Sequence, residues 1–439
     1  MRKTKGKNGI TLMALVITII ILLILAGIAI SSLTQTGLFS KAQEAKQKTE
    51  EKTEEENTTL NEYEKWIAKY ENNGYKGQPI TNVDTSKTNP EGAMPKGATV
   101  IEGNGDEGIV IKDSNDNEWV WVEVQKNITE GYTYNRDIEK ALQKYAGDYK
   151  EGQTDWTDEW YAEDGNNLVT ASTADLTTEQ KALKNGCGLT YDEYDIAKSK
   201  MLQSIKTNGG FWISRYEAGI SGTNTDATSD EIQNVRYSHS DITKDSPKAV
   251  SQADRIPYNW VTCSEAQTLA SAMSTDSNKT SSLLFGIQWD LACKFIETKA
   301  NLPEKDIKTD STIWGNYKNC SITLTRGRYN VSPADSSSVW KKFSVDTNYY
   351  VTKSQISSNE SYTQLLTTGA SEDAKKMNIY DFAGNMWEWT LEKTFKNNYP
   401  CANRGGSFVY SGSDYPASYR DAYSIIDSYA DFGFRSTLY

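Results

Sequence analysis

Few residue types in this chain are suited to metal or redox chemistry. His239 is the single histidine among 439 residues, which excludes a three-histidine iron site and an HExxH zinc site. It lies in the polar stretch 237–240, where we expect it to be solvated. The five cysteines contain no CxxC pair, and although a disulfide is possible outside the cytoplasm, their spacing names no partners. Cys263 and Cys293 have apolar helical surroundings and are expected to be small core residues.

The most distinctive stretch for binding is the run 408–432. Five Tyr, five Ser and four Asp fill more than half of its 25 positions, and it lacks Lys and Glu, which are abundant elsewhere in the chain. Tyrosine offers a large amphipathic ring with few rotatable bonds, while serine and aspartate offer adaptable hydrogen bonds. This composition is typical of a binding surface. The alternative is an ordinary surface loop that happens to be rich in tyrosine.

Apolar blocks frame the run and must position it. GNMWEW (384–389) and RGGS (404–407) precede it, and GFR (433–435) follows it. A long irregular segment held between rigid elements is where binding residues tend to lie. We therefore expect the blocks to be buried scaffold and the run to face solvent.

The order and spacing of these blocks resemble the sulfatase-modifying-factor branch of the C-type lectin fold, the branch of the formylglycine-generating enzymes. Three earlier segments agree with the resemblance: NEWVWVEV (117–124), GGFWISRYEA (209–218) and NWVTCSEA (259–266). The expected fold class is therefore α+β, a C-type lectin fold of the formylglycine-generating-enzyme subtype, preceded by a transmembrane and stalk α-helix.

The resemblance implies a copper site that this chain lacks. Formylglycine-generating enzymes place two copper-binding cysteines shortly after GGS, and the matching positions here are near Tyr410 and Tyr415. A phenol does not supply the thiolate that binds copper(I), and no cysteine follows Cys401. No convergent set of thiols or imidazoles is visible either. We predict that the protein is not an enzyme and binds no copper, iron or zinc; an enzyme of the sulfatase-modifying type with an altered active site is the alternative.

The resemblance also implies a structural calcium site. The corresponding family segment binds calcium through two side chains and two main-chain carbonyls, which match Asp381, Gly384, Met386 and Glu388. The two carboxylates here suit this hard cation. The alternative is that Glu388 only caps or pairs in the core. The EPN, QPD and WND triplets of calcium-dependent lectins are absent, so no glycan is inferred through calcium.

A restricted set of codons would explain the unusual composition of the run. Every residue type in 408–432 can be encoded by a codon that ends in a pyrimidine, whereas Lys, Glu, Gln, Met and Trp cannot. Randomised adenines in Asn codons would give this set, and the pattern resembles the variable proteins of diversity-generating retroelements. Gly412, Pro416, Arg420 and Ala422 are read as fixed scaffold, and chance composition is the alternative. The predicted variable, ligand-binding positions, within a variable region of about 404–435, are Phe408, Val409, Tyr410, Ser413, Asp414, Tyr415, Tyr419, Asp421, Tyr423, Asp427, Ser428, Tyr429, Asp431 and Phe432.

The N-terminus predicts a membrane anchor. A basic leader, 1–9, precedes 24 residues without charge, 10–33, which is long enough for a helix to cross a bilayer. Because the positive side stays in the cytoplasm, everything after Leu33 is expected outside. The segment resembles a type IV prepilin cleaved between Gly9 and Ile10. It departs from that pattern at Ala14, where pilins usually have Glu, so a plain signal anchor remains the alternative.

The rest of the chain is divided by composition. We expect a helical stalk over 34–72, a linker rich in Gly, Pro, Asn and Thr over 73–98, and a head over 99–439 with an insertion at about 126–205. Within the head, helices are predicted over 178–184, 193–206, 264–274 (with a Ser264 N-cap) and 288–298, and strands at 119–122 and 210–216.

These features predict a bacterial cell-surface protein that displays a binding head outside the cytoplasm. Its expected partners are the membrane, an unknown protein or surface ligand, and other pilins if the helix assembles. A structural minor pilin is a further alternative. The excess of 59 Asp and Glu over 47 Lys and Arg argues against a nucleic-acid partner, because a phosphate backbone requires a basic face.

Overall fold

The structure is a computed structural model, and it describes residues 16–26, 46, 48, 52, 77–147, 149, 156–157, 160, 178–223, 230–274, 276–342, 351–352, 363–396 and 398–439. Residues Met1–Tyr75 and Lys76–Tyr439 form two separate units. In the first, residues 16–26 are helical. Among the helices of the described residues, none combines the length and apolarity needed to cross a bilayer. The predicted processing site at Gly9 and Ile10 lies outside the described residues.

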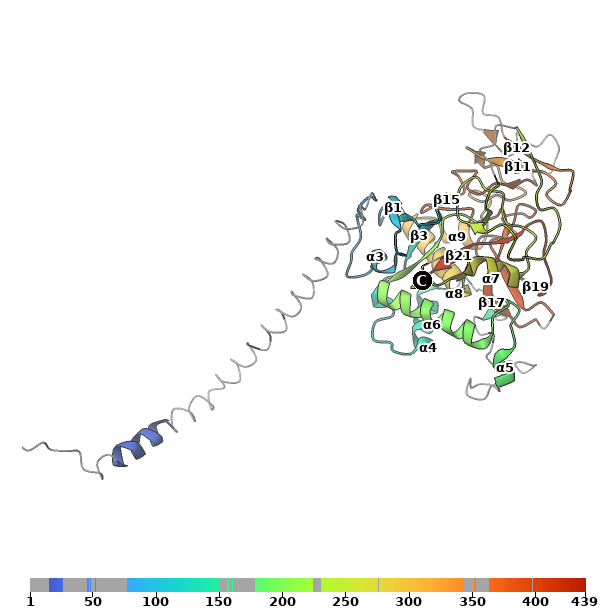
Figure 1. The fold of residues 1–439 in the computed structure, drawn as a ribbon. Coiled ribbons are helices and arrows are strands. Elements are labelled where there is room, and N and C mark those ends of the chain that lie inside the picture. Colours follow the sequence, from blue (N-terminus) through green and yellow to red (C-terminus); the bar gives the residue numbers. More distant parts are fainter. Residues whose placement is uncertain are drawn as a thin grey trace, which may run out of the picture. The chain divides into compact units, whose positions relative to one another are not determined.

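A six-stranded antiparallel sheet forms the centre of the head (Figure 1). The alternating Trp and Val residues of its third strand are all buried, since both faces of that strand are covered. The last strand of the chain pairs with two others in this sheet, so the C-terminus lies within the head. In spatial order the strands are β1 (Thr99–Glu102), β2 (Val110–Lys112), β3 (Glu118–Glu123), β5 (Gly210–Ser214), β21 (Ser436–Leu438) and β9 (Ser281–Leu283).

A second sheet brings the framing blocks together. Its order is β19 (Arg420–Tyr423), β18 (Cys401–Arg404), β17 (Trp387–Thr394) and β20 (Phe432–Phe434), and β4 (Trp156–Thr157) also pairs with β17. Strand β17 is antiparallel to β18 and parallel to β20. Glu388 therefore lies between Arg404 of RGGS and Gly433 of GFR, so the three blocks that are separate in sequence form adjacent strands.

The helices predicted in the head are present, with shifted ends. They are α5 (Thr178–Ala182), α6 (Tyr191–Asn208), α7 (Cys263–Ser271) and α8 (Gly286–Lys299). The N-cap of α7 is Thr262 rather than Ser264: its hydroxyl accepts from the Glu265 backbone, and the Glu265 carboxylate accepts from the Thr262 backbone in return. The predicted strand 210–216 ends at Ser214.

The other described elements complete the head around these sheets. They are α3 (Pro90–Ala93), the 3₁₀ helix η1 (Lys126–Ile128), α4 (Asn135–Ala146), α9 (Glu304–Lys308), β6 (Gly219–Ile220), β7 (Glu231–Gln233), β8 (Ala249–Val250), β10 (Thr323–Leu324), β11 (Arg328–Asn330), β12 (Val339–Lys342), β13 (Val351–Thr352), β14 (Leu365–Leu366), β15 (Lys375–Lys376) and β16 (Ile379–Tyr380).

The predicted linker 73–98 needs a correction, because its described part, 77–98, packs against the head. Thr88 is 1 % exposed, and its hydroxyl donates to the Gly209 carbonyl (2.9 Å) and accepts from the Trp121 indole (2.9 Å). Ala93 is also fully buried. A composition rich in Gly and Pro indicates that the local backbone favours turns and loops, but it does not predict tertiary contacts of this kind.

Candidate functional site

The first half of the tyrosine-rich run has a backbone held by a supporting segment, 306–319. The Tyr410 carbonyl accepts from the Lys318 amide (2.8 Å), and the Gly412 carbonyl accepts from the Ser311 amide (3.0 Å). The Ala417 carbonyl accepts from the Trp289 indole (3.0 Å). These bonds use main-chain atoms of the run, so they do not depend on which side chains the run presents.

Three tyrosines of this half pack on one buried tryptophan. Ring centroids of Tyr410, Tyr415 and Tyr419 lie 6.2, 5.5 and 6.1 Å from that of Trp387, which is fully buried. Tyr415 also contacts Tyr410 (4.7 Å) and Tyr419 (4.9 Å). Edge-on contacts at these distances stabilise aromatic clusters beyond the area that they bury. All three tyrosines stay partly exposed.

A second aromatic cluster stands on the next tryptophan of the same strand. Trp389 lies two residues after Trp387 in β17, so both indoles lie on one face of the strand. Trp389 contacts Tyr423 (6.1 Å) and Phe432 (5.2 Å), and Tyr429 contacts Phe432 (4.9 Å). We call the five partly exposed tyrosines over these two tryptophans the aromatic surface: Tyr410, Tyr415, Tyr419, Tyr423 and Tyr429.

Asp421 joins the two halves of the aromatic surface. Its carboxylate accepts from the Tyr423 hydroxyl (3.1 Å). Burial is the main cause of the raised pKa of the Tyr410, Tyr419 and Tyr423 phenols. The nearby negative charge of Asp421 raises the pKa of each further. The phenols are therefore neutral hydrogen-bonding groups at physiological pH.

Three of the positions predicted to contact a ligand are buried, so the prediction is wrong for them. Phe408 is 3 % exposed, Phe432 is 2 % exposed and Asp431 is 9 % exposed. Phe432 begins strand β20 and lies opposite Trp387 in the sheet. It therefore belongs to the buried layer beneath the aromatic surface, which we call the floor and which includes Phe408, Asp431 and Phe432. Asp431 accepts a hydrogen bond from the Ser407 hydroxyl (2.8 Å), and its burial raises its pKa to about 6. Composition could not distinguish these buried residues from the solvent-exposed residues of the run, because both groups contain the same residue types.

The other predicted variable positions reach solvent. Two residues that were not among them are also prominent: Ile425 is 50 % exposed and Ile426 is 77 % exposed. Both have codons that can end in a pyrimidine, so the codon pattern could have included them. The partly or fully exposed predicted positions are Val409, Tyr410, Ser413, Asp414, Tyr415, Tyr419, Asp421, Tyr423, Asp427, Ser428 and Tyr429.

Arg420, predicted as scaffold, lies in a buried ion-pair network beneath the run. Its guanidinium donates to both Asp290 oxygens (2.6 Å each), to Glu392 (3.0 Å) and to the Tyr149 carbonyl (2.6 Å). Arg404 of RGGS contacts the same two carboxylates, at 2.8 and 3.0 Å. Two arginines and two carboxylates thus neutralise each other out of contact with water. Gly412 and Pro416, also predicted as scaffold, are buried, and Ala422 is partly exposed.

The predicted calcium residues lie in a buried acidic region that contains an arginine. Both oxygens of Glu388 accept from the Arg435 guanidinium (2.7–3.1 Å), and an Asp381 oxygen accepts from the Gly369 amide (2.7 Å). Burial raises the pKa of Glu388, and that of Asp381 to about 6. Glu217 is also fully buried nearby, where burial and then Asp381 raise its pKa. Arg435 thus supplies at Glu388 the positive charge that a calcium ion would supply.

Calcium binding by this segment, through Asp381 and Glu388 with the carbonyls of Gly384 and Met386, stays a prediction. Its test is the melting temperature of wild type in excess chelator and in excess calcium. Binding at 100 times the dissociation constant would stabilise the folded state by about 2.7 kcal/mol. Asp381→Asn keeps an acceptor for the Gly369 amide and is expected to remove most of the response, whereas Asp414→Asn, at an exposed position, is the control. Identical melting of wild type in chelator and calcium contradicts the prediction.

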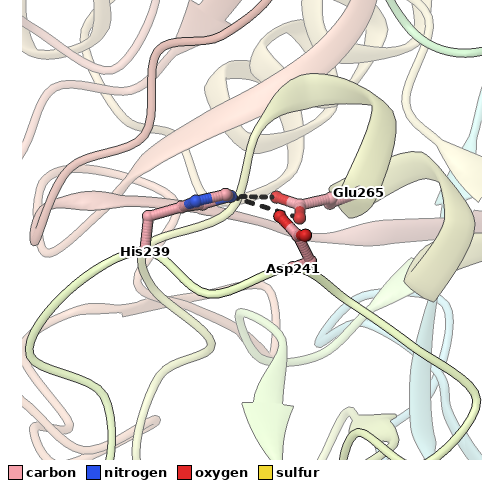
Figure 2. A group of neighbouring side chains, drawn as sticks. All are labelled: His239, Asp241 and Glu265. Atoms are coloured by element: carbon pink, nitrogen blue, oxygen red, sulfur yellow. Dashed lines mark hydrogen bonds and ion pairs between the residues drawn. The ribbon is translucent and has the colours of Figure 1, made fainter.

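His239, expected to be solvated, has close acidic neighbours (Figure 2). Its Nε2 lies 3.1 and 3.2 Å from the Glu265 oxygens, and one ligand atom from each of His239, Asp241 and Glu265 lies within 4.8 Å of the others. Glu265 is also the carboxylate that caps α7 and accepts from the Ile242 amide. Sequence reasoning missed this group because its members come from a loop and a helix start.

The expectation that no thiols converge is wrong. Cys187, Cys263 and Cys401 lie together: the first two sulfurs are 3.2 Å apart, and the Cys401 thiol interacts with both. Their sequence positions are far apart, so spacing gave no sign of this group. All three are fully buried, in contrast to the partly exposed aromatic surface.

Comparisons with known proteins define the family. The sulfatase-modifying factor enzyme 1-like domain matches residues 189–438, which is 250 of the 439 residues and so more than half. The chain therefore belongs to this family. Strands β1–β3 precede the matched region, and β3 pairs with β5 inside it. Helix α6, most of which falls in the predicted insertion 126–205, lies entirely within the match.

Two solved structures are similar to parts of the chain. CarF matches at 14 % identity and a TM-score of 0.30, covering 52 % of this chain and 85 % of CarF. The Treponema denticola variable protein 1 matches at 13 % identity and a TM-score of 0.20, covering 82 % of this chain and 98 % of that protein. Superpositions of this quality establish no shared function. No curated protein sequence matches the chain.

Proposed function

We propose that this protein is a bacterial cell-surface binding protein whose aromatic surface recognises a protein or another surface ligand. The observation that supports this most is that residues 408–432 divide into a buried part that holds the backbone and a solvent-exposed part that is free to contact a ligand. Main-chain hydrogen bonds and buried residues such as Arg420 hold the segment, while its five tyrosines and most of its serines and aspartates reach solvent. A surface of this kind can change its side chains and keep its fold.

The same division supports diversification by a retroelement. Replacing an exposed side chain leaves the bonds at Tyr410, Gly412 and Ala417 in place, because they use main-chain atoms. Variation at exposed positions that do not pack on the tryptophans, such as Ser413 and Asp414, is expected to change the free energy of unfolding by no more than about 0.5 kcal/mol per site. The proposal requires a template copy of these codons near a reverse transcriptase in the neighbouring DNA.

Charge indicates the chemistry of the ligand. Asp414, Asp421 and Asp427 are the charged side chains of the run that reach solvent, because Arg420 is buried. Tyrosine faces attract cations as well as apolar groups. A ligand that presents lysine or arginine among apolar side chains fits this combination.

The same features argue against an oxidase. The positions that the resemblance matches to the copper-binding cysteines lie near Tyr410 and Tyr415, whose rings are 4.7 Å apart in the aromatic surface. Cys401 lies in strand β18, where it is fully buried beside the Cys187 and Cys263 thiols and does not reach solvent. Phenols there provide binding area and hydrogen bonds in place of a redox metal.

Placement outside the cell rests on the sequence of the N-terminus. The basic leader, 1–9, and the uncharged stretch, 10–33, support an anchor with the head on the outer side. A pilin-like cleavage after Gly9 is part of the same proposal, and Ala14 favours display over assembly into a filament.

A random-peptide display library is the probe for the binding proposal. Peptides selected on the wild-type protein are expected to be rich in Lys and Arg, and their binding should weaken as salt is added. Tyr419→Ser and Tyr429→Ser together remove one ring from each half of the aromatic surface. Hot-spot tyrosines contribute about 2 kcal/mol or more each, so the loss of affinity should exceed about 30-fold for one ring and approach about 900-fold if the two losses add.

Tyr132 and Tyr134 provide the matched control. Both are exposed, at 44 % and 73 %, and lie outside the aromatic surface, so their replacement by Ser should leave binding unchanged. Tyr429→Ser alone, at a ring that is 46 % exposed, keeps the test valid if the double variant melts early. Equal peptide affinity in wild type and the folded Tyr429→Ser and double variants would refute the proposed surface.

A further inference from the structure

A pair of buried thiols joins two elements that are far apart in sequence. The Cys187 and Cys263 sulfurs lie 3.2 Å apart, and the two residues are separated by 76 positions. Both side chains are fully buried. A disulfide bond is about 2.0 Å long, so small rotations of the two side chains would be enough to bring the sulfurs to bonding distance.

Each cysteine is held in place by its own local structure. Cys187 lies in a turn in which the Asn185 side chain accepts from the amides of Cys187 (2.9 Å) and Leu189 (3.1 Å). Cys263 is the first residue of α7, directly after the Thr262 cap. The sulfurs therefore meet because two fixed turns meet, which is the geometry that a crosslink needs.

A bulge in β17 provides the surroundings of the pair. The pairing of β17 with β18 shifts register between Trp389 and Lys393, and the Thr390 carbonyl accepts from the thiols of Cys187 (3.7 Å) and Cys263 (3.6 Å). These bonds are long and weak. Oxidation would remove two weak donors from this carbonyl and gain a covalent bond.

We propose that Cys187 and Cys263 form a disulfide when the folding chain meets an oxidising environment. The oxidant is a disulfide of low molecular weight or of a thiol oxidase, RSSR. The two cysteine thiols lose two protons and two electrons as their S–S bond forms, and RSSR takes both up to leave as two RSH. No other co-reactant is needed.

The crosslink would join two parts of the head. Cys187 lies just before residue 189, where the family match begins, and Cys263 opens a helix inside the match. The disulfide would therefore tie the preceding segment to the family domain. Closing a loop of this length restricts the unfolded chain and stabilises the fold. Persistence of the bond in the cell requires the proposed placement outside the cytoplasm.

Cys401 is a third thiol beside the pair. Its sulfur lies 3.6 Å from the Gly186 carbonyl, next to Cys187, and interactions with the Cys187 and Cys263 thiols lower its pKa to about 5. Oxidation of the pair removes both of these thiol donors, and the burial of Cys401 then favours its neutral thiol. Cys401→Ala removes the third thiol, with which the disulfide could exchange, and is expected to leave the Cys187–Cys263 bond intact.

The test is disulfide mapping of the full-length protein. Reduced protein is unfolded, refolded with oxidised glutathione, and then blocked with a thiol-alkylating reagent under denaturing conditions. Mass spectrometry of the digest should show one crosslinked peptide pair, containing Cys187 and Cys263. Cys293 and Cys320, which are also buried, serve as internal controls and should be alkylated. The oxidised protein should melt on the order of 5 °C above the same protein after reduction.

The comparison of oxidised and reduced wild type avoids any variant that fails to fold. Alkylation of both Cys187 and Cys263 after refolding would overturn the proposal, and so would a crosslink from either of them to Cys401 in wild type. A result of either kind leaves the binding proposal untouched, because peptide binding is measured separately and at a different surface.

Discussion

Replacing Arg420 by alanine is expected to lower the free energy of unfolding by about 3–5 kcal/mol. Arg420 is 1 % exposed, and its guanidinium neutralises Asp290 and Glu392 together with Arg404. Removal of one arginine leaves two buried carboxylates facing a single positive charge. Chemical denaturation at neutral pH, followed by tryptophan fluorescence, measures the loss.

Two further variants test whether the loss is specific to Arg420: one keeps the positive charge at that position, and the other changes an exposed residue of the run 408–432. Arg420→Lys keeps the charge but loses the planar, two-pronged contact with Asp290, so an intermediate loss is expected. Ser413→Ala, at an exposed position seven residues earlier in the run, should change stability by no more than about 0.5 kcal/mol. An Arg420→Ala protein as stable as the Ser413→Ala protein would show that Arg420 is not scaffold.

The contrast between Arg420 and Ser413 shows what the sequence could predict. Gly412, Pro416 and Arg420 were interpreted as fixed scaffold, and all three are buried, whereas Ala422, which was interpreted in the same way, is partly exposed. The blocks RGGS and GFR provide buried arginines, Arg404 and Arg435, that pair with acidic residues of β17. Such motif residues are recognisable because their roles in the family scaffold require particular side chains.

The aromatic surface shows where sequence reasoning stops. Tyrosines were expected to be nearly free of the scaffold, yet Tyr415 and Tyr423 pack on Trp387 and Trp389. Substitutions there should therefore cost some stability as well as binding. The contact of Tyr423 with Trp389 depends on the pairing of β17 with β18 and of β18 with β19, which no local pattern in these strands specifies.

The buried thiols have the same explanation. Cys187, Cys263 and Cys401 belong to a turn, a helix start and a strand, and the tertiary fold alone brings them together. His239 and Glu265 meet for a similar reason. Residue type identifies side chains that can react or bind a metal, whereas their proximity depends on how elements that are distant in sequence pack together.

Replacing Asp431 by asparagine is expected to stabilise the protein at neutral pH and to leave it unchanged near pH 4. Burial raises the pKa of this carboxyl from 3.8 to about 6, which corresponds to about 3 kcal/mol against its ionised form. In the unfolded chain the carboxyl ionises near pH 4. Between these pH values the folded state binds more protons than the unfolded state, so the stability due to this group falls as pH rises from about 4 to about 6.

Asparagine keeps an oxygen that can accept from the Ser407 hydroxyl and does not titrate. The gain over wild type should therefore grow from near zero at pH 4 to about 2–3 kcal/mol at pH 7.5, measured by denaturant unfolding across this range. Asp414→Asn, at an exposed position of the run, controls for the general loss of one acidic charge and should show no such trend. A pH-independent difference between Asp431→Asn and wild type would mean that Asp431 is solvated. The floor of the aromatic surface would then be open to water, and a ligand could reach the carboxylate directly.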